Sequence, residues 1–157
     1  MKWLFQVLWI AFPICGQTTE ARGWADHWAN AYGLQRELVY AVIEVESAWN
    51  PSAMSHAGAA GLMQLMPGTA ATFGVTNRFD IAENIRGGVA YLAWLRNHCG
   101  NDWRLVLASY NAGHAAVLRR GLNYDSEEVR RYVERVAHVY RRNRWQTLLQ
   151  LERRELP

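Results

Sequence analysis

The chain has 157 residues, half of them hydrophobic, with eight Trp, seven Tyr and a formal net charge of +3 at pH 7. This length fits one domain that is large enough for a hydrophobic core, and no second domain is expected. The composition excludes a disordered chain, and no repeat or low-complexity segment is present.

The N-terminal segment has the pattern of a secretory signal peptide. Lys2 is followed by an apolar run over residues 3–14 and then by polar residues up to Ala21. The run is too short for a comfortable transmembrane helix, and Thr19-Glu20-Ala21 offers small residues at the two positions that a signal peptidase inspects. We therefore expect a signal peptide over residues 1–21 and a mature domain over 22–157. Because Lys2 is the only basic side chain before the run, an uncleaved membrane anchor is the alternative.

The mature domain has one cysteine and no pattern of metal ligands. Cys15 lies in the expected signal peptide, so Cys99 has no intramolecular disulfide partner and is expected to be structural. The five His are scattered at positions 27, 56, 98, 114 and 138, without the spacing of ligands. We therefore expect no metal and no cofactor.

The first two helices of the mature domain are predicted over residues 24–31, ended by Gly33, and over residues 35–48. The second contains no Gly or Pro, and its apolar residues recur three and four apart. At roughly 100° per residue, Glu44 and Glu46 project to nearly opposite sides. Glu44 shares its side with Glu37, seven residues earlier, whereas Glu46 lies on the apolar side.

A carboxylate on an apolar stripe is costly, so Glu46 needs a hydrogen bond or a proton. Desolvation raises the pKa of such a group into the range of a general acid. The alternative is a glutamate in a salt bridge or at a frayed helix end, since perturbed acids also occur in structural ion pairs.

The segment after this helix resembles the wall of a ligand cleft. Asn50-Pro51 is predicted to end the helix, because proline disfavours the α conformation of the residue before it. Small residues dominate from Ser52 to Gly61, so that the backbone can approach a ligand closely. Over residues 62–66, Gln64 is one amide among four apolar side chains.

Three further helices are predicted, and the fold class is all-α or nearly so. The first follows Asp80 and ends at Gly100, the second covers Trp103–Ala112, and the third is capped by Asp125 or Ser126. Only residues 73–77 have a strand-like pattern.

Between Arg130 and Arg144 there are six Arg and one Glu, a basic face that could bind nucleic acid, anionic lipid or the acidic stem peptides of peptidoglycan. A solvated charged face is at least as good an interpretation, and no nucleic-acid motif is present.

Three motifs resemble those of the soluble lytic transglycosylase (SLT) domain, which cleaves the glycan strands of peptidoglycan. The resemblance covers about residues 34–140, with Tyr110-Asn111-Ala112-Gly113 similar to the second motif and Glu128, Arg130 and Tyr132 similar to the third. The family usually has threonine where this chain has Val129, which weakens a role for Glu128 more than for Tyr132. The residues similar to the first motif are Glu46-Ser47, Asn50-Pro51, Ala53, Ser55, Gly58-Ala59, Gly61-Leu62-Met63-Gln64, Met66-Pro67 and Thr69-Ala70.

The resemblance implies a lysozyme-like helical fold with a sugar cleft beside the catalytic helix, and a periplasmic enzyme. Such an enzyme cleaves the β-1,4 bond between N-acetylmuramic acid and N-acetylglucosamine and forms a 1,6-anhydromuramoyl end. By resemblance Glu46 is the catalytic acid and Tyr132 holds it. Substrate-binding roles are implied for Ser55, Gln64, Met66, Tyr110, Glu128 and Tyr132.

The implied partner is the peptidoglycan glycan strand. Small transglycosylases of this kind also resemble those that serve a secretion, pilus or conjugation apparatus, an analogy at the level of the family. No nucleic-acid partner is expected, and no stable membrane span if the signal peptide is cleaved.

Two alternatives stay open at this point: a goose-type lysozyme-like hydrolase, and a non-catalytic peptidoglycan-binding assembly component. Hydrolysing glycosidases use a second carboxylate, and Asp80, Glu83 and Glu128 are the acids that folding could bring near Glu46. Each of the three also has a plain role at the start of a helix. The sequence therefore favours the transglycosylase.

Overall fold

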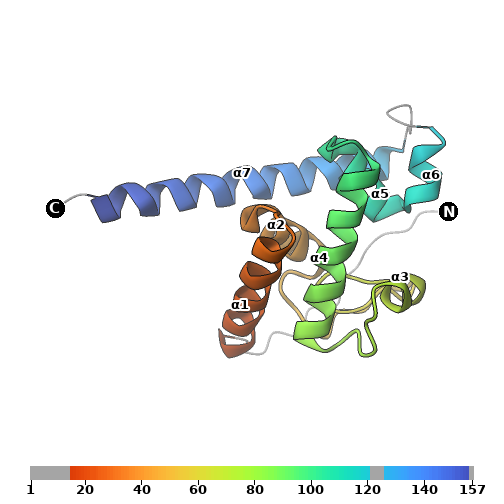
Figure 1. The fold of residues 1–157 in the computed structure, drawn as a ribbon, viewed down its shortest axis with the longest axis horizontal. Coiled ribbons are helices and arrows are strands. Elements are labelled where there is room, and N and C mark those ends of the chain that lie inside the picture. The colour runs from red at the N-terminus through yellow and green to blue at the C-terminus, as the bar shows by residue number, and fades with distance from the viewer. Residues whose placement is uncertain (1–14, 121–125, 156–157) are drawn as a thin grey trace.

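The computed structural model describes residues 15–120 and 126–155. This part of the chain contains seven helices and no strand, which confirms the all-α prediction (Figure 1). Residues 73–77 form a turn followed by irregular chain, and β-type pairing over the described ranges is limited to isolated bridges in the loop of residues 54–65. The helices are α1 (Cys15–Ala31), α2 (Arg36–Ser47), α3 (Pro67–Thr72), α4 (Ile81–His98), α5 (Trp103–Ala112), α6 (His114–Leu118) and α7 (Glu127–Glu155).

Helix α2 lies in the middle of the fold. Its apolar side chains Val39, Val42 and Ile43 are fully buried and belong to a core cluster that also takes in residues of α1, α4, α5 and α7. Helix α7 packs most extensively on α2 and runs across the molecule beside it and α5 (Figure 1). The end of α2 is thereby enclosed between a loop and the longest helix.

Helix α2 covers residues 36–47, which confirms the predicted span of 35–48 to within one residue at each end, but the chain leaves the helix at Ala48 and Trp49 rather than at Asn50-Pro51. Ala48 adopts a left-handed conformation with φ 50°, and its N–H donates to the carbonyl of Glu44 at 2.9 Å. Trp49 is also left-handed, with φ 66°. The two residues turn the chain back, and the Trp49 ring is thereby buried in the core. Burial of this large ring compensates for an unfavourable backbone conformation.

Helix α1 is longer than predicted and is part of the core. Its residues Ala21, Ala25 and Ala29, four apart, are buried, and α1 packs mainly on α4. The hydroxyl of Tyr40 on α2 donates to Asp26 at 2.6 Å. Ala21, after which we expect cleavage, lies within this helix, and the apolar run of residues 3–14 is outside the described residues. The signal peptide therefore stays a prediction.

The other helix boundaries agree closely with the sequence. Asp80 caps α4 by accepting the N–H of Glu83 at 2.8 Å, and α5 begins at Trp103. Ser126 accepts the N–H of Val129 at 3.4 Å at the start of α7, while Asp125, the other candidate cap, lies outside the described residues. In residues 15–120 and 126–155, none of the helices combines the length and apolar character that a membrane crossing requires.

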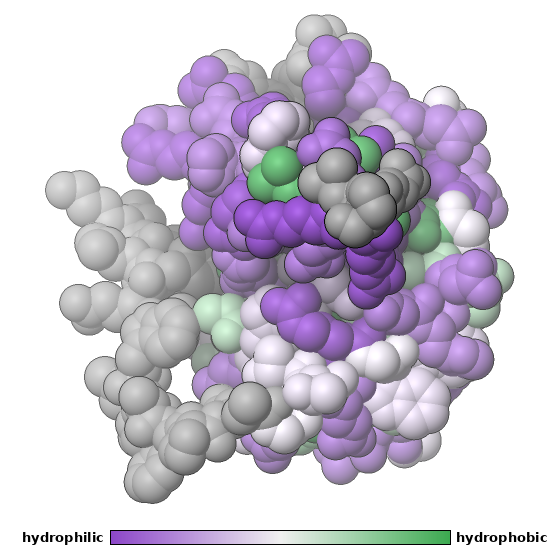
Figure 2. Space-filling view, turned by 90° about the vertical axis from the view of Figure 1, so that its left-hand side faces the viewer, coloured by the Kyte–Doolittle hydropathy of each residue, from purple (hydrophilic) through white to green (hydrophobic). Residues whose placement is uncertain are grey.

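The C-terminal part of α7 projects beyond the rest of the molecule (Figure 1). Seen from that end, the surface is mostly hydrophilic, with small hydrophobic patches beside the helix end (Figure 2). Trp145, Leu148 and Leu151 are among the exposed apolar side chains of this part.

Candidate active site

Glu46 lies in the last turn of α2 and is largely enclosed. The hydroxyl of Tyr132, a buried residue of α7, donates to Oε1 of Glu46 at 2.6 Å, the contact that the resemblance implies. Burial raises the pKa of Glu46 to about 7, although the Tyr132 hydrogen bond and the positive charge of Arg135 act in the opposite direction. The carboxyl can therefore hold a proton near neutral pH and release it in a reaction.

Glu44 lies on the other side of α2, as the helical spacing predicts. Its Oε2 accepts a hydrogen bond from Arg142 at 2.6 Å on the surface. Glu37, predicted to share the charged side, is instead buried, and Asn143 of α7 donates to its backbone carbonyl at 3.4 Å. Two glutamates two residues apart thus occupy different environments, one enclosed and one solvated.

Tyr110 joins α5 to the loop that precedes α3. Its hydroxyl donates to the carbonyl of Met63 at 2.8 Å, and its ring packs on that of Tyr91 with centroids 5.2 Å apart. Burial, and then the neighbouring charge of Glu46, raise the pKa of Tyr110 well above its usual range. The residue therefore stays a neutral phenol whose ring borders the acid.

Ser55 and Gln64 both make hydrogen bonds within the loop, and each keeps a polar atom that can bind a ligand. The Ser55 hydroxyl accepts the N–H of Ala59 at 3.0 Å, which leaves its own proton available to a ligand. Gln64, with φ 46°, donates from Nε2 to the carbonyls of Ala53 at 3.0 Å and Gly61 at 2.9 Å. Because these bonds use the amide N–H groups, its contribution to a ligand is the acceptor Oε1.

The two methionines of the motif have different environments. Met63 is fully buried in the core, whereas Met66 is exposed to 44% at the start of α3. Met66 is therefore accessible from the surface, whereas Met63 is core packing.

Glu128 is exposed in the first turn of α7, four residues before Tyr132. Val129 beside it is buried against Ala108 and Val117, so the position where the family has threonine serves packing in this chain. Of the candidate second acids, Asp80 caps α4, and Glu83 accepts hydrogen bonds from the N–H groups of residues 76 and 77 at 2.6 and 3.0 Å. Both carboxylates thus have structural partners at the start of α4.

Asn84 of α4 is a site residue that we did not predict. It is buried, accepts the N–H of Met63 at 2.8 Å, and donates to the carbonyls of Ala60 at 3.0 Å and Arg78 at 2.7 Å. One side chain therefore fixes the backbone on both sides of Gly61. The signal in the sequence was a lone amide in the stripe formed by Ile81, Ile85 and Val89.

The described residues contain no group of three or more His, Cys, Asp or Glu that could hold a metal ion. The site offers one carboxyl that can be protonated near neutral pH, a tyrosine that orients it, and a loop that carries a hydroxyl and an amide oxygen.

Together, the helical bundle and the enclosed Glu46 in the last turn of α2 define a lysozyme-like domain. The chain belongs to the Transglycosylase SLT domain family, whose model matches residues 24–133. Among curated proteins, it is similar to the membrane-bound lytic murein transglycosylase F of Desulfosudis oleivorans, with 46% identity over 95 residues. That match covers 57% of this chain and 21% of the relative.

Solved structures of two lytic transglycosylases have a similar fold. The 70 kDa soluble enzyme of Escherichia coli gives a TM-score of 0.74 at 27% identity, over 87% of this chain and 25% of that chain. An inactive glutamate-to-glutamine mutant of the lytic transglycosylase Slt of Pseudomonas aeruginosa gives a TM-score of 0.71 at 28% identity. This match also covers 87% of this chain and 25% of the other chain. The chain therefore spans about a quarter or less of the length of these relatives.

Proposed function

We propose that this chain is a peptidoglycan lytic transglycosylase that cleaves the β-1,4 bond between N-acetylmuramic acid and N-acetylglucosamine. The observation that carries the proposal is the enclosed acid Glu46. Burial raises its pKa to about 7, and the Tyr132 hydroxyl orients the carboxylate by donating to Oε1 at 2.6 Å. The names of the relatives agree, and in one of them replacing a glutamate by glutamine gives an inactive protein.

In the proposed reaction, Glu46 donates its proton to the glycosidic oxygen as the bond from that oxygen to muramoyl C1 breaks. The resulting carboxylate takes the proton of the C6 hydroxyl while O6 bonds to C1. Glu46 regains its proton, no water is consumed, and the product has a 1,6-anhydromuramoyl end. Tyr132 keeps the carboxylate in place through both proton transfers, which require hydrogen-bond distance.

The loop and α5 supply the proposed sugar contacts. Ser55 donates its free hydroxyl proton and Gln64 accepts through Oε1, while Met66 and the Tyr110 ring line the subsites. Glu128 is assigned a contact at the edge of the cleft, since it is exposed on the same helix as Tyr132.

A transglycosylase fits these residues better than a hydrolase. Retaining glycosidases need a second carboxyl roughly 5 Å from the first, and inverting ones roughly 6.5–9.5 Å away. Of the three candidate second acids, Asp80 and Glu83 are engaged at the start of α4, and the exposed Glu128 is assigned a substrate contact rather than a role as a second catalytic acid. The C6 hydroxyl is already tethered to the reacting sugar, so its effective concentration far exceeds that of an outside water.

Mass spectrometry of a peptidoglycan digest tests this proposal. A lytic transglycosylase releases muropeptides one water lighter than those of a hydrolase. Products that carry mainly a reducing muramic acid end would instead identify a goose-type lysozyme-like hydrolase. Intact peptidoglycan after prolonged incubation would identify a non-catalytic binding or assembly component.

We further propose a periplasmic location, reached through the signal peptide, and service to a secretion, pilus or conjugation apparatus. The location follows from the substrate and from the apolar run of residues 3–14. N-terminal sequencing of protein from the periplasmic fraction tests the cleavage site. Cross-linking in cells that express such an apparatus tests the association, and an unchanged cross-link pattern in its absence would reject it.

A further inference from the structure

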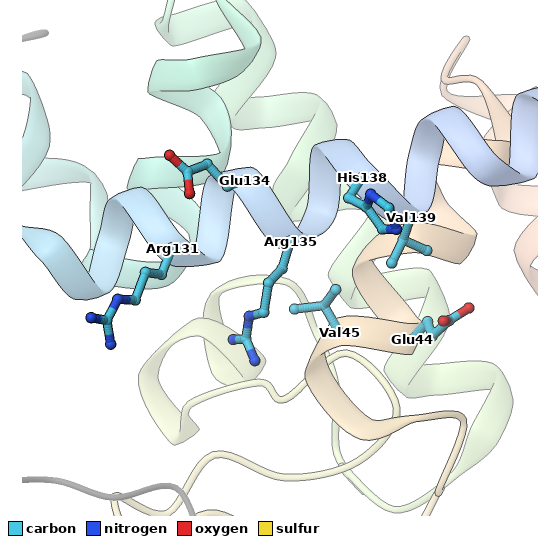
Figure 3. A pocket seen from close by; sticks show the side chains of 7 residues that line it. All are labelled: Glu44, Val45, Arg131, Glu134, Arg135, His138 and Val139. Atoms are coloured by element: carbon cyan, nitrogen blue, oxygen red, sulfur yellow. The ribbon is translucent and has the colours of Figure 1, made fainter.

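A groove of about 500 Å³ runs between α2 and α7 and is lined in part by Val45, Val139, Arg131 and Arg135 (Figure 3). Val45 directly precedes Glu46. Arg135 lies near enough to Glu46 for its charge to act on that carboxyl. The groove therefore adjoins the acid, although none of the sugar-binding positions implied by the sequence lies in it.

The two arginines give one wall of the groove a positive charge. Their side chains extend from α7 in the same direction (Figure 3). Arg131 pairs with Glu127 on the preceding turn of the helix. Arg135 is exposed, and no hydrogen bond or ion pair joins it to another of the described residues. Its guanidinium is thus free to bind an anionic ligand.

The acids that line the groove do not neutralise this wall. Glu44 pairs with Arg142 at 2.6 Å. Glu134 points away from the two arginines, on the other side of α7 (Figure 3). His138, farther along α7, is the remaining polar side chain of the lining. A carboxylate that enters near Arg135 would therefore meet positive charge.

We propose that this groove binds the short peptide carried by muramic acid, with Arg135 as the residue that binds a peptide carboxylate. The inference rests on the proposed function. Such peptides combine alanine methyl groups with free carboxylates. In the groove, the methyl groups would pack on Val45, Val139 and the aliphatic stems of the arginines, and a carboxylate would bind a guanidinium. Guanidinium groups bind carboxylates through two parallel hydrogen bonds, which gives orientation as well as affinity.

The position of the groove fits the substrate. The peptide is attached to the same muramic acid whose C1 reacts beside Glu46, so it must leave the cleft close to the acid. Binding it in the adjoining groove would fix the muramic acid relative to Glu46 and distinguish peptide-bearing strands from bare ones. Arg135 is thus a specificity residue for the same site.

The test compares two substrates with the same enzyme: glycan strands that carry stem peptides, and the same strands after an amidase has removed them. For each, kcat and KM are measured at pH 5.5, below the pKa of Glu46 of about 7, so that the acid is protonated in every variant. The wild type should prefer the peptide-bearing strands. Arg135→Gln should reduce this preference about tenfold, mainly through KM, the loss expected for one charge-assisted hydrogen bond.

Two further variants make the result specific. Arg135→Lys should keep part of the preference, because the charge remains and the two-bond geometry does not. Arg144→Gln makes the same change of charge at an exposed position of α7 that does not line the groove, and should keep the wild-type preference.

Equal rates on both substrates for the wild type, or an equal preference in Arg135→Gln, would overturn the inference while leaving the proposed function intact. The same holds if Arg135→Gln instead abolishes binding to anionic phospholipid vesicles without changing the preference. Failure of the wild type to release anhydro ends from either substrate would reject the proposed function itself.

Discussion

The hydroxyl of Tyr132 lies 2.6 Å from Oε1 of Glu46, although 86 residues separate the two in sequence. The contact exists because α7 packs on α2. Among the described residues, this is the most extensive packing between two helices. It favours the charged carboxylate, whereas burial favours the protonated form, and burial has the larger effect. The resulting pKa near 7 lets one group first donate a proton and then accept one.

Glu46→Gln should lower kcat/KM on peptidoglycan at least about a hundredfold, because an amide cannot supply the proton. Glu44→Gln is the matched control, since it makes the same change two residues away on the opposite side of α2. On glycan strands without stem peptides, which do not use the groove that Glu44 lines, it should leave activity within about twofold, because exposed ion pairs such as that with Arg142 contribute little. An inactive Glu44→Gln with an active Glu46→Gln would reject the assignment.

The activity should depend on pH through Glu46. The acid must be protonated to start the reaction, so kcat/KM should fall as the pH rises through about 7. A profile that stays level to pH 9 would mean that another group donates the proton.

The raised pKa of Glu46 should also make the stability of the folded protein depend on pH. The pKa in the folded state, about 7, lies above the ordinary glutamate value of 4.5, so the folded state binds more protons between these pH values. The stabilisation from this group is full below pH 4.5 and is lost as the pH rises to about 7, a loss of about 3 kcal/mol. Glu46→Gln does not titrate, so its melting temperature relative to wild type should rise by about 5 °C or more between pH 4.5 and pH 8. A constant difference would contradict the raised pKa.

Tyr132→Phe should reduce turnover about tenfold and melting temperature only slightly, because the ring stays packed while Glu46 loses its orienting bond. It should also move the falling limb of the pH profile upward, since the lost hydrogen bond had lowered the pKa of Glu46. Tyr140→Phe is the control, because the Tyr140 hydroxyl on the same helix binds Gln35 instead. Equal turnover in the two variants would assign Tyr132 to packing alone.

Periodicity and spacing predicted α2, α5 and the enclosed position of Glu46, because these follow from local alternation of apolar residues. The left-handed turn that ends α2 could not be predicted, since neither Ala48 nor Trp49 favours a left-handed conformation and burial of the Trp49 ring accompanies it. The length of α1 was missed because its stripe of alanines begins within a segment that resembles a signal peptide.

Within the site, the sequence identified Glu46 itself but could not supply its surroundings. The pairing with Tyr132 came from family resemblance, since spacing alone does not bring distant helices together. Arg135 was one of six arginines in a basic stretch, and only the packing of α7 on α2 distinguishes it. Asn84 could be recognised as an unusual polar residue in an apolar stripe, but its backbone partners could not.

The last prediction concerns the loop that carries Gln64. Gly61 has φ +79°, and a Cβ there would lie 2.1 Å from the Arg78 carbonyl oxygen and 2.2 Å from Nδ2 of Asn84. Gly61→Ala therefore combines a strained backbone with contacts that real atoms do not make, and it must displace the three hydrogen bonds of Asn84. We expect a loss of about 3 kcal/mol or more in unfolding free energy, together with most of the activity.

Gly58→Ala separates the two causes. Gly58 also has a positive φ, +86°, but nothing lies within 4 Å of a Cβ at that position, so only the backbone strain applies. That strain costs about 1–2 kcal/mol. Urea denaturation of both variants, with kcat/KM on peptidoglycan measured in parallel, should give the larger loss for Gly61→Ala in both quantities. Equal losses would mean that backbone conformation alone limits these positions, and that the close packing of Gly61 on Arg78 and Asn84 does not hold the loop in its active position.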